Sequence, residues 1–329
     1  MLYMPINPGM TIMKKILFLL VAGLFGSCSA RTTTADEVLL VKTPSKISLY
    51  LPCAGHDARY IRVDMDYFFN PAKRTRLWRL TRAYDMERTG DYTFRNRLSK
   101  EFVYPGEWEC AFMQLKEGRR MPDFTGGFHG YEELTEVEMF FDGEPLDLAR
   151  KENGVGREVK FRQRSQMYEY GTDHPIAEHV KELTCSVEGI EVAQWITWLE
   201  EVEVGDMKFV MLPIARSLSD GTQITDRLVM DDSERVYDVS RSDRTLSVEG
   251  RDVRKVRIWG RESGLFAEVE VDYEPWMPGN RFFCSMYTPQ DGYNKLYFTH
   301  CENRSVSRGE VWKSRARYRL GILEKQGGE

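Results

Sequence analysis

The stretch that decides the fold class is YIRVDMDY, residues 60–67, in which apolar and polar side chains alternate. In an extended chain, Ile61, Val63 and Met65 would point to one side and the charged residues between them to the other. A period of two is typical of a β-strand with one buried face, whereas a helix would need apolar residues three and four positions apart. Residues 60–67 therefore predict a half-buried strand.

The same alternation recurs through most of the chain, as in residues 137–141, 190–198, 269–273 and 312–320. Glycine-containing turns, such as Asp142-Gly143 and Glu188-Gly189, separate these segments. Helical periodicity is scarce, and its best candidate is the Arg- and Leu-rich segment 71–86. The pattern predicts an all-β fold, an antiparallel β-sandwich or jelly roll with little helix, that forms a single domain over residues 38–325.

The first thirty residues have the order of a secretory signal. Two lysines precede the apolar run 16–25, which is short for a membrane span, and a Gly-Ser pair precedes Cys28. This order resembles the lipobox of bacterial lipoproteins, in the relaxed form of the Bacteroidota. The resemblance implies a signal peptide over residues 1–27, with Met13 as a second candidate start, a lipid on Cys28 and a tether over residues 28–37. It also implies a protein outside the cytoplasm, lipid-anchored at the outer membrane on its periplasmic or surface face.

The charge, the cysteine spacing and the motifs of the sequence restrict the ligands and cofactors that can be predicted. With 46 basic and 51 acidic residues, the chain has a net charge of −5, which argues against a nucleic-acid-binding protein. Six cysteines are present and no two form a CxxC pair, so neither a zinc ribbon nor a thioredoxin-like motif is predicted, and the sequence leaves any disulfide pairing open. No GxSxG, P-loop or dinucleotide motif occurs, and no cofactor or metal is predicted.

Residues 159–170 carry the most informative polar row. Val159, Phe161 and Met167 would lie on one face of a strand. Arginine pairs with a uronate carboxylate in bidentate geometry, glutamine bonds carboxyl or hydroxyl groups, and tyrosine stacks on sugars or exchanges a proton. Shorter rows of this kind occur in residues 295–299 and 313–319. The row suits an acidic sugar, and the alternative is an ordinary solvated sheet face. Its members are Lys160, Arg162, Arg164, Gln166, Tyr168 and Tyr170.

A second candidate is the glycine-rich segment FTGGFHGYE, residues 124–132. Glycines on both sides of His129 permit a tight turn, and a histidine held there beside Tyr131 could transfer protons. The alternative is a turn whose histidine only caps backbone groups. The spacing of His129 and Glu132 resembles the zinc-binding turn of the zinc carboxypeptidases, which implies two metal ligands. However, the chain continues into an alternating strand where that family has a helix, and no third histidine follows in its frame.

Export, an all-β pattern and these residue types together resemble the β-jelly-roll polysaccharide lyases. The resemblance implies β-elimination on an acidic poly- or oligosaccharide, with Arg164 and Gln166 as carboxylate neutralisers, His129 as base and Tyr168 as acid. Two alternatives remain: a non-catalytic glycan-binding lipoprotein, and a hydrolase that uses a metal or paired carboxylates such as Glu132 and Glu133. The side chains expected to contact substrate are Arg162, Tyr170, Tyr131 and Tyr297.

Overall fold

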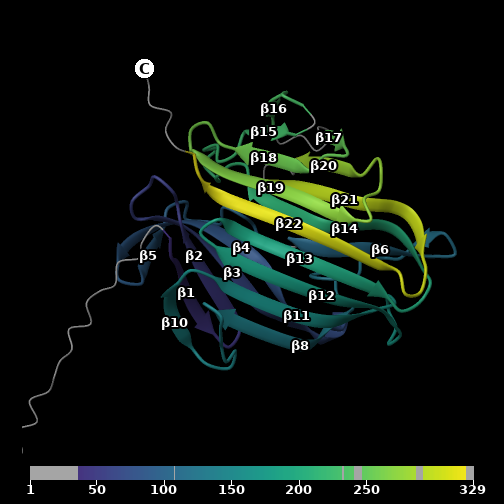
Figure 1. The fold of residues 1–329 in the computed structure, drawn as a ribbon. Coiled ribbons are helices and arrows are strands. Elements are labelled where there is room, and N and C mark those ends of the chain that lie inside the picture. The colour runs from purple at the N-terminus through teal and green to yellow at the C-terminus, as the bar shows by residue number, and fades with distance from the viewer. Residues whose placement is uncertain (1–35, 107, 232, 241–246, 287–291, 324–329) are drawn as a thin grey trace, which may run out of the picture. The chain divides into compact units, whose positions relative to one another are not determined.

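The computed structural model describes residues 36–323, apart from 107, 232, 241–246 and 287–291, and these residues form two β-sheets. In the larger sheet the strands follow the order β10-β1-β2-β3-β4-β8-β11-β12-β13-β22-β19-β18-β15-β16, with β5 beside β4 and β9 beside β8. The smaller sheet has the order β17-β20-β21-β14-β6-β7. All pairings are antiparallel except a short parallel one between β4 and β8. Figure 1 shows β8, β11, β12, β13 and β22 side by side in the larger sheet.

The larger sheet contains β1 (Val38–Thr43), β2 (Lys46–Pro52), β3 (Arg59–Asn70), β4 (Thr75–Gly90), β5 (Thr93–Asn96), β8 (Glu132–Phe141), β9 (Glu144–Pro145), β10 (Glu152–Gly156), β11 (Val159–Tyr168), β12 (Pro175–Ser186), β13 (Gly189–Trp198), β15 (Arg227–Met230), β16 (Tyr237–Asp238), β18 (Lys255–Trp259), β19 (Leu265–Glu274) and β22 (Val311–Ile322). The smaller sheet contains β6 (Glu109–Lys116), β7 (Arg119–Arg120), β14 (Val202–Ala215), β17 (Ser247–Arg251), β20 (Arg281–Met286) and β21 (Tyr293–Val306). The 3-10 turn η1 spans Pro71–Lys73.

The hydrophobic core lies between the inner faces of the two sheets. In β13, buried and partly exposed residues alternate along the whole strand, as the sequence predicts. Trp198 of β13 packs edge-on against Trp312 of β22 and Phe112 of β6, so the core joins both sheets. Burying side chains of this size stabilises a fold by roughly 1.5–3 kcal/mol each. The predicted all-β sandwich is thereby confirmed.

The expectation of a helix over residues 71–86 is wrong. Only η1 is helical there, and residues from Thr75 onward form β4. The register with β3 shifts between Asp64 and Met65, because Thr81 is an extra residue in β4. Such a bulge interrupts the period of two, so Leu80 and Ala83, three positions apart, both reach the core and the segment lacks a simple strand pattern.

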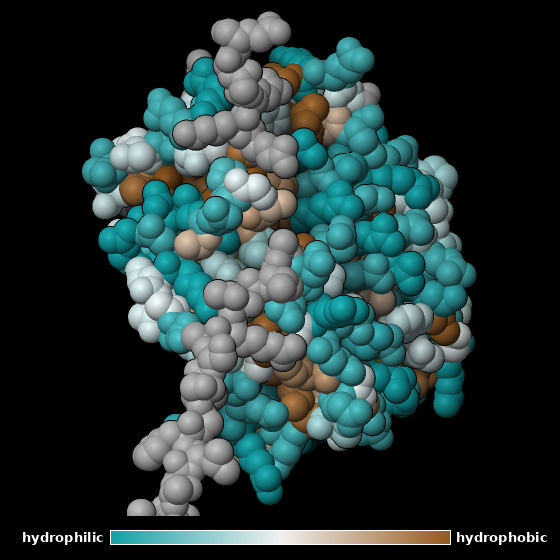
Figure 2. All heavy atoms as spheres, turned by 60° about the vertical axis from the view of Figure 1, so that its left-hand side comes forward, coloured by the Kyte–Doolittle hydropathy of each residue, from teal (hydrophilic) through white to brown (hydrophobic). Residues whose placement is uncertain are grey.

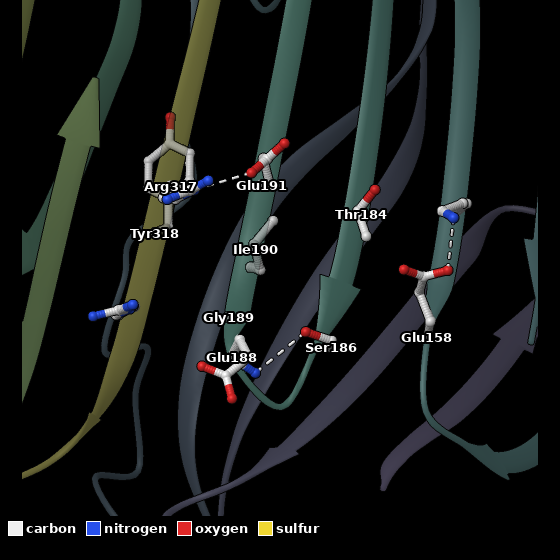
Figure 3. Close-up of a pocket in the computed structure, with 11 residues that line it drawn as sticks. Glu158, Thr184, Ser186, Glu188, Gly189, Ile190, Glu191, Arg317 and Tyr318 are labelled. Atoms are coloured by element: carbon white, nitrogen blue, oxygen red, sulfur yellow. Dashed lines mark hydrogen bonds and ion pairs between the residues drawn. The ribbon is translucent and has the colours of Figure 1, made fainter. Parts of the chain in front are cut away.

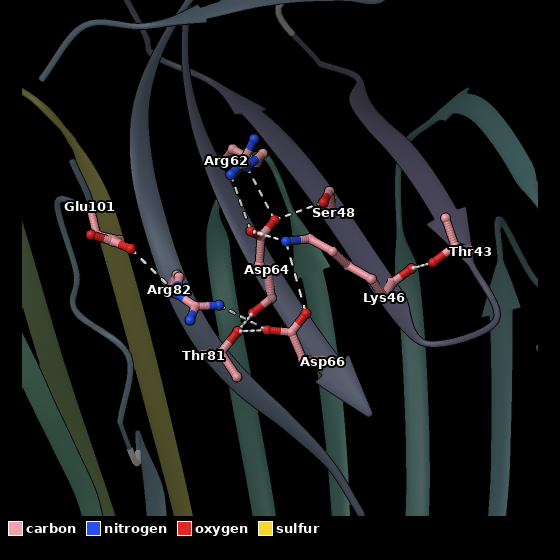
Figure 4. A network of polar contacts seen from close by, with 9 residues as sticks. All are labelled: Thr43, Lys46, Ser48, Arg62, Asp64, Asp66, Thr81, Arg82 and Glu101. Atoms are coloured by element: carbon pink, nitrogen blue, oxygen red, sulfur yellow. Dashed lines mark hydrogen bonds and ion pairs between the residues drawn. The ribbon is translucent and has the colours of Figure 1, made fainter. Parts of the chain in front are cut away.

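The strand over residues 60–67 is confirmed within β3, but its polar side is only partly open to water. Asp64 is fully buried and lies between Lys46 of β2, at 2.7 Å, and Arg62, at 3.1 Å, and it accepts a hydrogen bond of 2.7 Å from Ser48 (Figure 4). A buried carboxylate is tolerated only with such compensation. The network therefore joins β2 and β3 on the face opposite the core.

The expected signal peptide, Cys28 and most of the tether lie outside the described residues. Within the described residues, no helix is long and apolar enough to cross a membrane. The face of the molecule in Figure 2 is mostly hydrophilic, with small separate hydrophobic patches. Cys53, Cys185, Cys284 and Cys301 are buried thiols outside any disulfide, and burial raises the pKa of each to about 12.

Candidate functional site

A cavity of about 510 Å³ lies on the outer face of the smaller sheet and is lined by both apolar and basic side chains. Phe282 and Cys284 of β20 point into the core, so Phe283 and Ser285 point the other way, into this cavity. Strands β6, β14, β20 and β21 form its floor, and the glycine-rich segment forms a wall. We call it the basic pocket. Its lining residues are Pro105, Gly106, Ala111, Phe124, Phe128, His129, Lys208, Met211, Phe283, Ser285, Lys295 and Tyr297.

Two stacked aromatic rings form the floor of the basic pocket. Phe283 and Tyr297 are direct partners across β20 and β21, and their ring centroids are 4.6 Å apart with an angle of 19° between planes. The Lys295 ammonium lies 5.1 Å from the Tyr297 centroid, and the Arg281 guanidinium lies 4.9 Å from the Phe283 centroid. Cations at this distance from ring faces are attracted to them. The floor is thus an aromatic platform between two cations.

Lys208 of β14 supplies a third cation. Its side chain is nearly buried, its ammonium lies 5.0 Å from the Phe124 ring centroid, and it forms an ion pair with Asp206. Burial lowers the pKa of Lys208, and the charge of Asp206 offsets part of this shift. The sequence reasoning missed Lys208. The only signal in the sequence was a lone lysine within an apolar run. The strand register beside Lys208 shifts, and this shift depends on the neighbouring strands, so the sequence could not show which way the side chain points.

His129 is held in the wall of the basic pocket by a carboxylate. Its Nδ1 lies 2.6 Å from Asp123 Oδ1, and Lys73 Nζ lies 3.2 Å from the other carboxylate oxygen. Partial burial alone would raise the pKa of Asp123, but the Phe124 backbone N–H, His129 and Lys73 hold it below its ordinary value. An ionised carboxylate only accepts hydrogen bonds, so Nδ1 is the donor. In the neutral ring, Nε2 is then the basic nitrogen.

The turn that carries His129 requires its glycines. Gly126 has a φ of +98° and donates a hydrogen bond of 2.8 Å to the Gly130 carbonyl. Gly130 has a φ of +110°, and a Cβ atom there would lie 2.6 Å from the Lys73 carbonyl oxygen. The turn therefore packs against η1 so closely that only glycine is accommodated. The predicted tight turn is present.

Glu132 stabilises the same turn by accepting a backbone hydrogen bond from it. Its buried carboxylate accepts a hydrogen bond of 2.9 Å from the Gly127 N–H and one of 2.5 Å from the Ser165 hydroxyl, and it lies 2.8 Å from His179 Nδ1. Burial would raise the pKa of Glu132, but His179, Lys181 and Ser165 outweigh burial and hold it at about 2. His129 and Glu132 thus have different partners. Among the described residues, no three His, Cys, Asp or Glu side chains gather where they could hold a metal ion.

The predicted arginine row lies elsewhere, on the outer face of the larger sheet. Arg164 of β11 is 3.5 Å from Glu136 of β8 and 3.7 Å from Glu178 of β12. Arg162 is likewise 3.2 Å from Glu182 and 4.0 Å from Glu138. Glutamates on both neighbouring strands therefore offset the charge of these arginines. Neither arginine lines the basic pocket.

The other predicted side chains form two pairs near the end of β11. The Tyr168 hydroxyl donates a hydrogen bond of 3.1 Å to Gln166 Oε1, and the Arg74 guanidinium covers the Tyr168 ring at 3.7 Å. Tyr131 and Tyr170 have ring centroids 4.7 Å apart. The structure thus brings His129 and Tyr297 together in the basic pocket, whereas Gln166, Tyr168, Tyr131 and Tyr170 do not line it.

A second hollow, of about 400 Å³, lies near the β12–β13 turn (Figure 3). Its cations also have acidic partners: Lys160 is 2.9 Å from Glu158, and Arg317 is 3.0 Å from Glu191. The row predicted in residues 313–319 continues this pattern, since Arg315 also pairs with Glu191 and Arg319 with Glu268. Exposed pairs of this kind contribute little to stability, because water and salt screen them. This face is the solvated sheet face that the sequence analysis kept as an alternative.

No protein-family model matches the chain, and no curated protein matches its sequence. Among solved structures, the fold is similar to a galactose mutarotase-like protein from Clostridium acetobutylicum, with a TM-score of 0.45 and 7% identity, covering 88% of this chain and 100% of that chain. It is also similar to a 4-alpha-glucanotransferase from Thermococcus litoralis, with a TM-score of 0.41 and 8% identity, covering 83% of this chain and 37% of that chain.

A third similar structure is an alpha-N-acetylgalactosaminidase from Bifidobacterium bifidum, with a TM-score of 0.41 and 10% identity, covering 87% of this chain and 36% of that chain. With TM-scores below 0.5, the three likenesses carry no argument about the activity of this chain.

Proposed function

We propose that the basic pocket binds an anionic carbohydrate, such as a uronate-containing glycan. The observation that carries the proposal is the stacked pair of Phe283 and Tyr297 with Lys208 and Lys295 beside it. The partly exposed edges of the stacked rings can lie against the apolar face of a sugar, the Tyr297 hydroxyl can hydrogen-bond it, and ammonium groups bind carboxylate or sulfate. Asp206 offsets part of the charge of Lys208 and Asp123 lies beside His129, but the described residues that line the pocket itself include two lysines and no carboxylate, which suits an anionic ligand.

The proposal is tested by calorimetric titration with uronate oligosaccharides and with neutral oligosaccharides of equal length. Wild-type protein should bind the charged ligands, and Tyr297→Ala or Lys208→Met should weaken binding at least tenfold. Arg164→Met is the matched control, because it removes a cation from the outer face of the larger sheet. Equal binding of charged and neutral ligands would contradict the proposal. So would equal losses in the Lys208 and Arg164 variants.

A second candidate function, β-elimination, is favoured by the contact between His129 and Asp123. In such a reaction His129 would take the proton beside the uronate carboxylate, and Lys208 and Lys295 would offset the carboxylate charge. The bond to the 4-linked sugar would break as a C4–C5 double bond forms, and Tyr297 would give the leaving oxygen a proton. His129 remains the proposed base, as the sequence predicted. The roles predicted for Arg164, Gln166 and Tyr168 are instead assigned to Lys208, Lys295 and Tyr297 of the basic pocket.

Catalysis and simple binding give different signals. A lyase would produce an unsaturated uronate that absorbs in the near ultraviolet, and His129→Ala should abolish that absorbance while Tyr131→Phe, outside the pocket, should not. If the protein binds the glycan but forms no such product, the basic pocket has the ligand-binding role only.

We also propose, from residues 13–28, that the protein is a lipoprotein of the outer membrane. Cys28→Ser should then abolish incorporation of labelled fatty acid into the expressed chain.

A further inference from the structure

Strand β21 carries a second pair of aromatic rings on the face that bears the basic pocket. Every second residue of β21 from Asn294 to Phe298 is buried, so Tyr293 points to the same side as Lys295 and Tyr297, which line the pocket. The Tyr293 ring centroid lies 5.1 Å from that of Tyr104, with an angle of 32° between planes. We call Tyr104 and Tyr293 the tyrosine pair. It shares one face of β21 with the basic pocket.

The tyrosine pair adjoins the wall of the basic pocket. Tyr104 directly precedes Pro105 and Gly106, which line the pocket. The Tyr104 backbone N–H donates a hydrogen bond of 2.8 Å to the carbonyl of Pro213 in β14, and Pro213 is the register partner of Lys295 in β21. The segment that carries Tyr104 is therefore fixed to β14 at the level of Lys295 and continues directly into the pocket wall.

Lys100 holds the Tyr104 ring in place. The Lys100 ammonium lies 5.2 Å from the Tyr104 centroid, donates a hydrogen bond of 2.6 Å to the Tyr104 hydroxyl, and also contacts the Ser217 carbonyl. Both rings of the tyrosine pair are partly exposed. Like the platform of the basic pocket, the pair combines partly exposed aromatic rings with a nearby cation. Ordered rings lose little conformational freedom when a ligand binds.

Lys295 lies midway along β21 between the two aromatic groups. Tyr293 and Tyr297 are four positions apart, which corresponds to about 13 Å along a strand. This length exceeds what a single sugar ring covers. A ligand that contacts both tyrosines would pass over Lys295, and an ammonium group there suits a carboxylate or sulfate. An acidic sugar chain meets these requirements, because it carries negative groups at intervals along its length.

We infer that the tyrosine pair is a second sugar-binding subsite, and that the ligand is an acidic oligosaccharide lying along the outer face of β21. One sugar contacts the platform of Phe283 and Tyr297, another contacts the tyrosine pair, and an anionic group between them binds Lys295. This inference rests on the proposed function of the basic pocket. It deepens that function, because it assigns a chain of several sugars, not a monosaccharide, as the ligand.

The test is calorimetric titration with oligogalacturonates, alginate oligomers and chondroitin oligosaccharides, each as a disaccharide and as a hexasaccharide. Wild-type protein should bind the hexasaccharide of its preferred glycan at least tenfold more tightly than the disaccharide. Tyr293→Leu keeps an apolar side chain and removes the flat ring, so it should lose about tenfold of hexasaccharide affinity and leave disaccharide affinity unchanged. Tyr104→Leu should behave in the same way, whereas Tyr297→Ala should weaken both ligands.

The matched control is Tyr170→Leu. Tyr170 is also a partly exposed tyrosine packed against a second tyrosine, but it does not line the basic pocket, so both affinities should be unchanged. Thermal unfolding checks that each variant is folded. If the hexasaccharide binds no more tightly than the disaccharide, or if the Tyr104 and Tyr293 variants bind it as wild type does, the tyrosine pair is not a subsite while the basic pocket stands. Equal losses for both ligands would also contradict the subsite. If wild-type protein binds no member of the panel, the proposed function is refuted and the inference with it.

Discussion

His300 of β21 should make the protein sensitive to mild acid. Its side chain has no exposed surface and is surrounded by the rings of Phe209, Tyr273 and Trp312 at centroid distances of 4.9–5.3 Å. Neither ring nitrogen has a hydrogen-bond partner among the described residues. Burial first, and then the charge of Arg304, lowers the pKa of His300 to about 4. The folded protein thus holds this imidazole neutral.

The sign of the effect follows from proton linkage. In the unfolded chain the pKa of a histidine is about 6.5, so as the pH falls the unfolded state binds the proton first. The free energy of unfolding is unaffected above pH 6.5 and declines between pH 6.5 and pH 4. For these two pKa values, the loss at pH 5 is about 2 kcal/mol, and below pH 4 it approaches about 3 kcal/mol. Such a loss is a large part of the stability of an ordinary domain.

The perturbation is His300→Phe, which keeps an aromatic ring in the cluster and removes the titration. Urea unfolding followed by tryptophan fluorescence at pH 7.5 and pH 5.0 measures the effect. Between these two pH values, wild type should lose about 2 kcal/mol more than the variant. Other acid-sensitive groups cancel in this difference. His174→Phe, at an exposed histidine, is the control and should lose as much as wild type. Parallel pH dependence of wild type and His300→Phe would refute the reasoning.

Further predictions concern the turn that carries His129. Gly130→Ala should destabilise the fold by at least about 1–3 kcal/mol, because the new Cβ would lie 2.6 Å from the Lys73 carbonyl at a φ of +110°. Gly118→Ala, with a φ of +71° in open space, is the control for backbone strain alone, and equal losses in thermal unfolding would contradict the packing argument. Glu132→Gln should cost about 3 kcal/mol at pH 7, measured by urea unfolding, because it removes the charge that His179 and the Gly127 N–H require. Since the pKa of Glu132 is lowered to about 2, its contribution is complete above pH 4.5 and is lost toward pH 2, so wild type and Glu132→Gln should converge in acid.

The sequence predicted the features of this protein that depend on neighbouring residues. A period of two is a property of eight or ten consecutive side chains, so strands such as β3 and β13 could be predicted, and with them the all-β sandwich. The glycine-rich turn could be predicted for the same reason, because positive φ is a demand on single residues. His129 and Tyr297 were both chosen from such local patterns.

Strand register, which joins residues far apart in the chain, decided the rest. Only the pairing of β11 with β8 and β12 shows that glutamates offset Arg162 and Arg164. The bulge in β4 hides the strand pattern of this segment, and the register shift in β14 lies beside Lys208. Both features depend on the partner strands. The sequence determined which segments are extended. The tertiary structure decided which of their charges remain near an open pocket, because a charge is offset by whichever residue lies beside it in space.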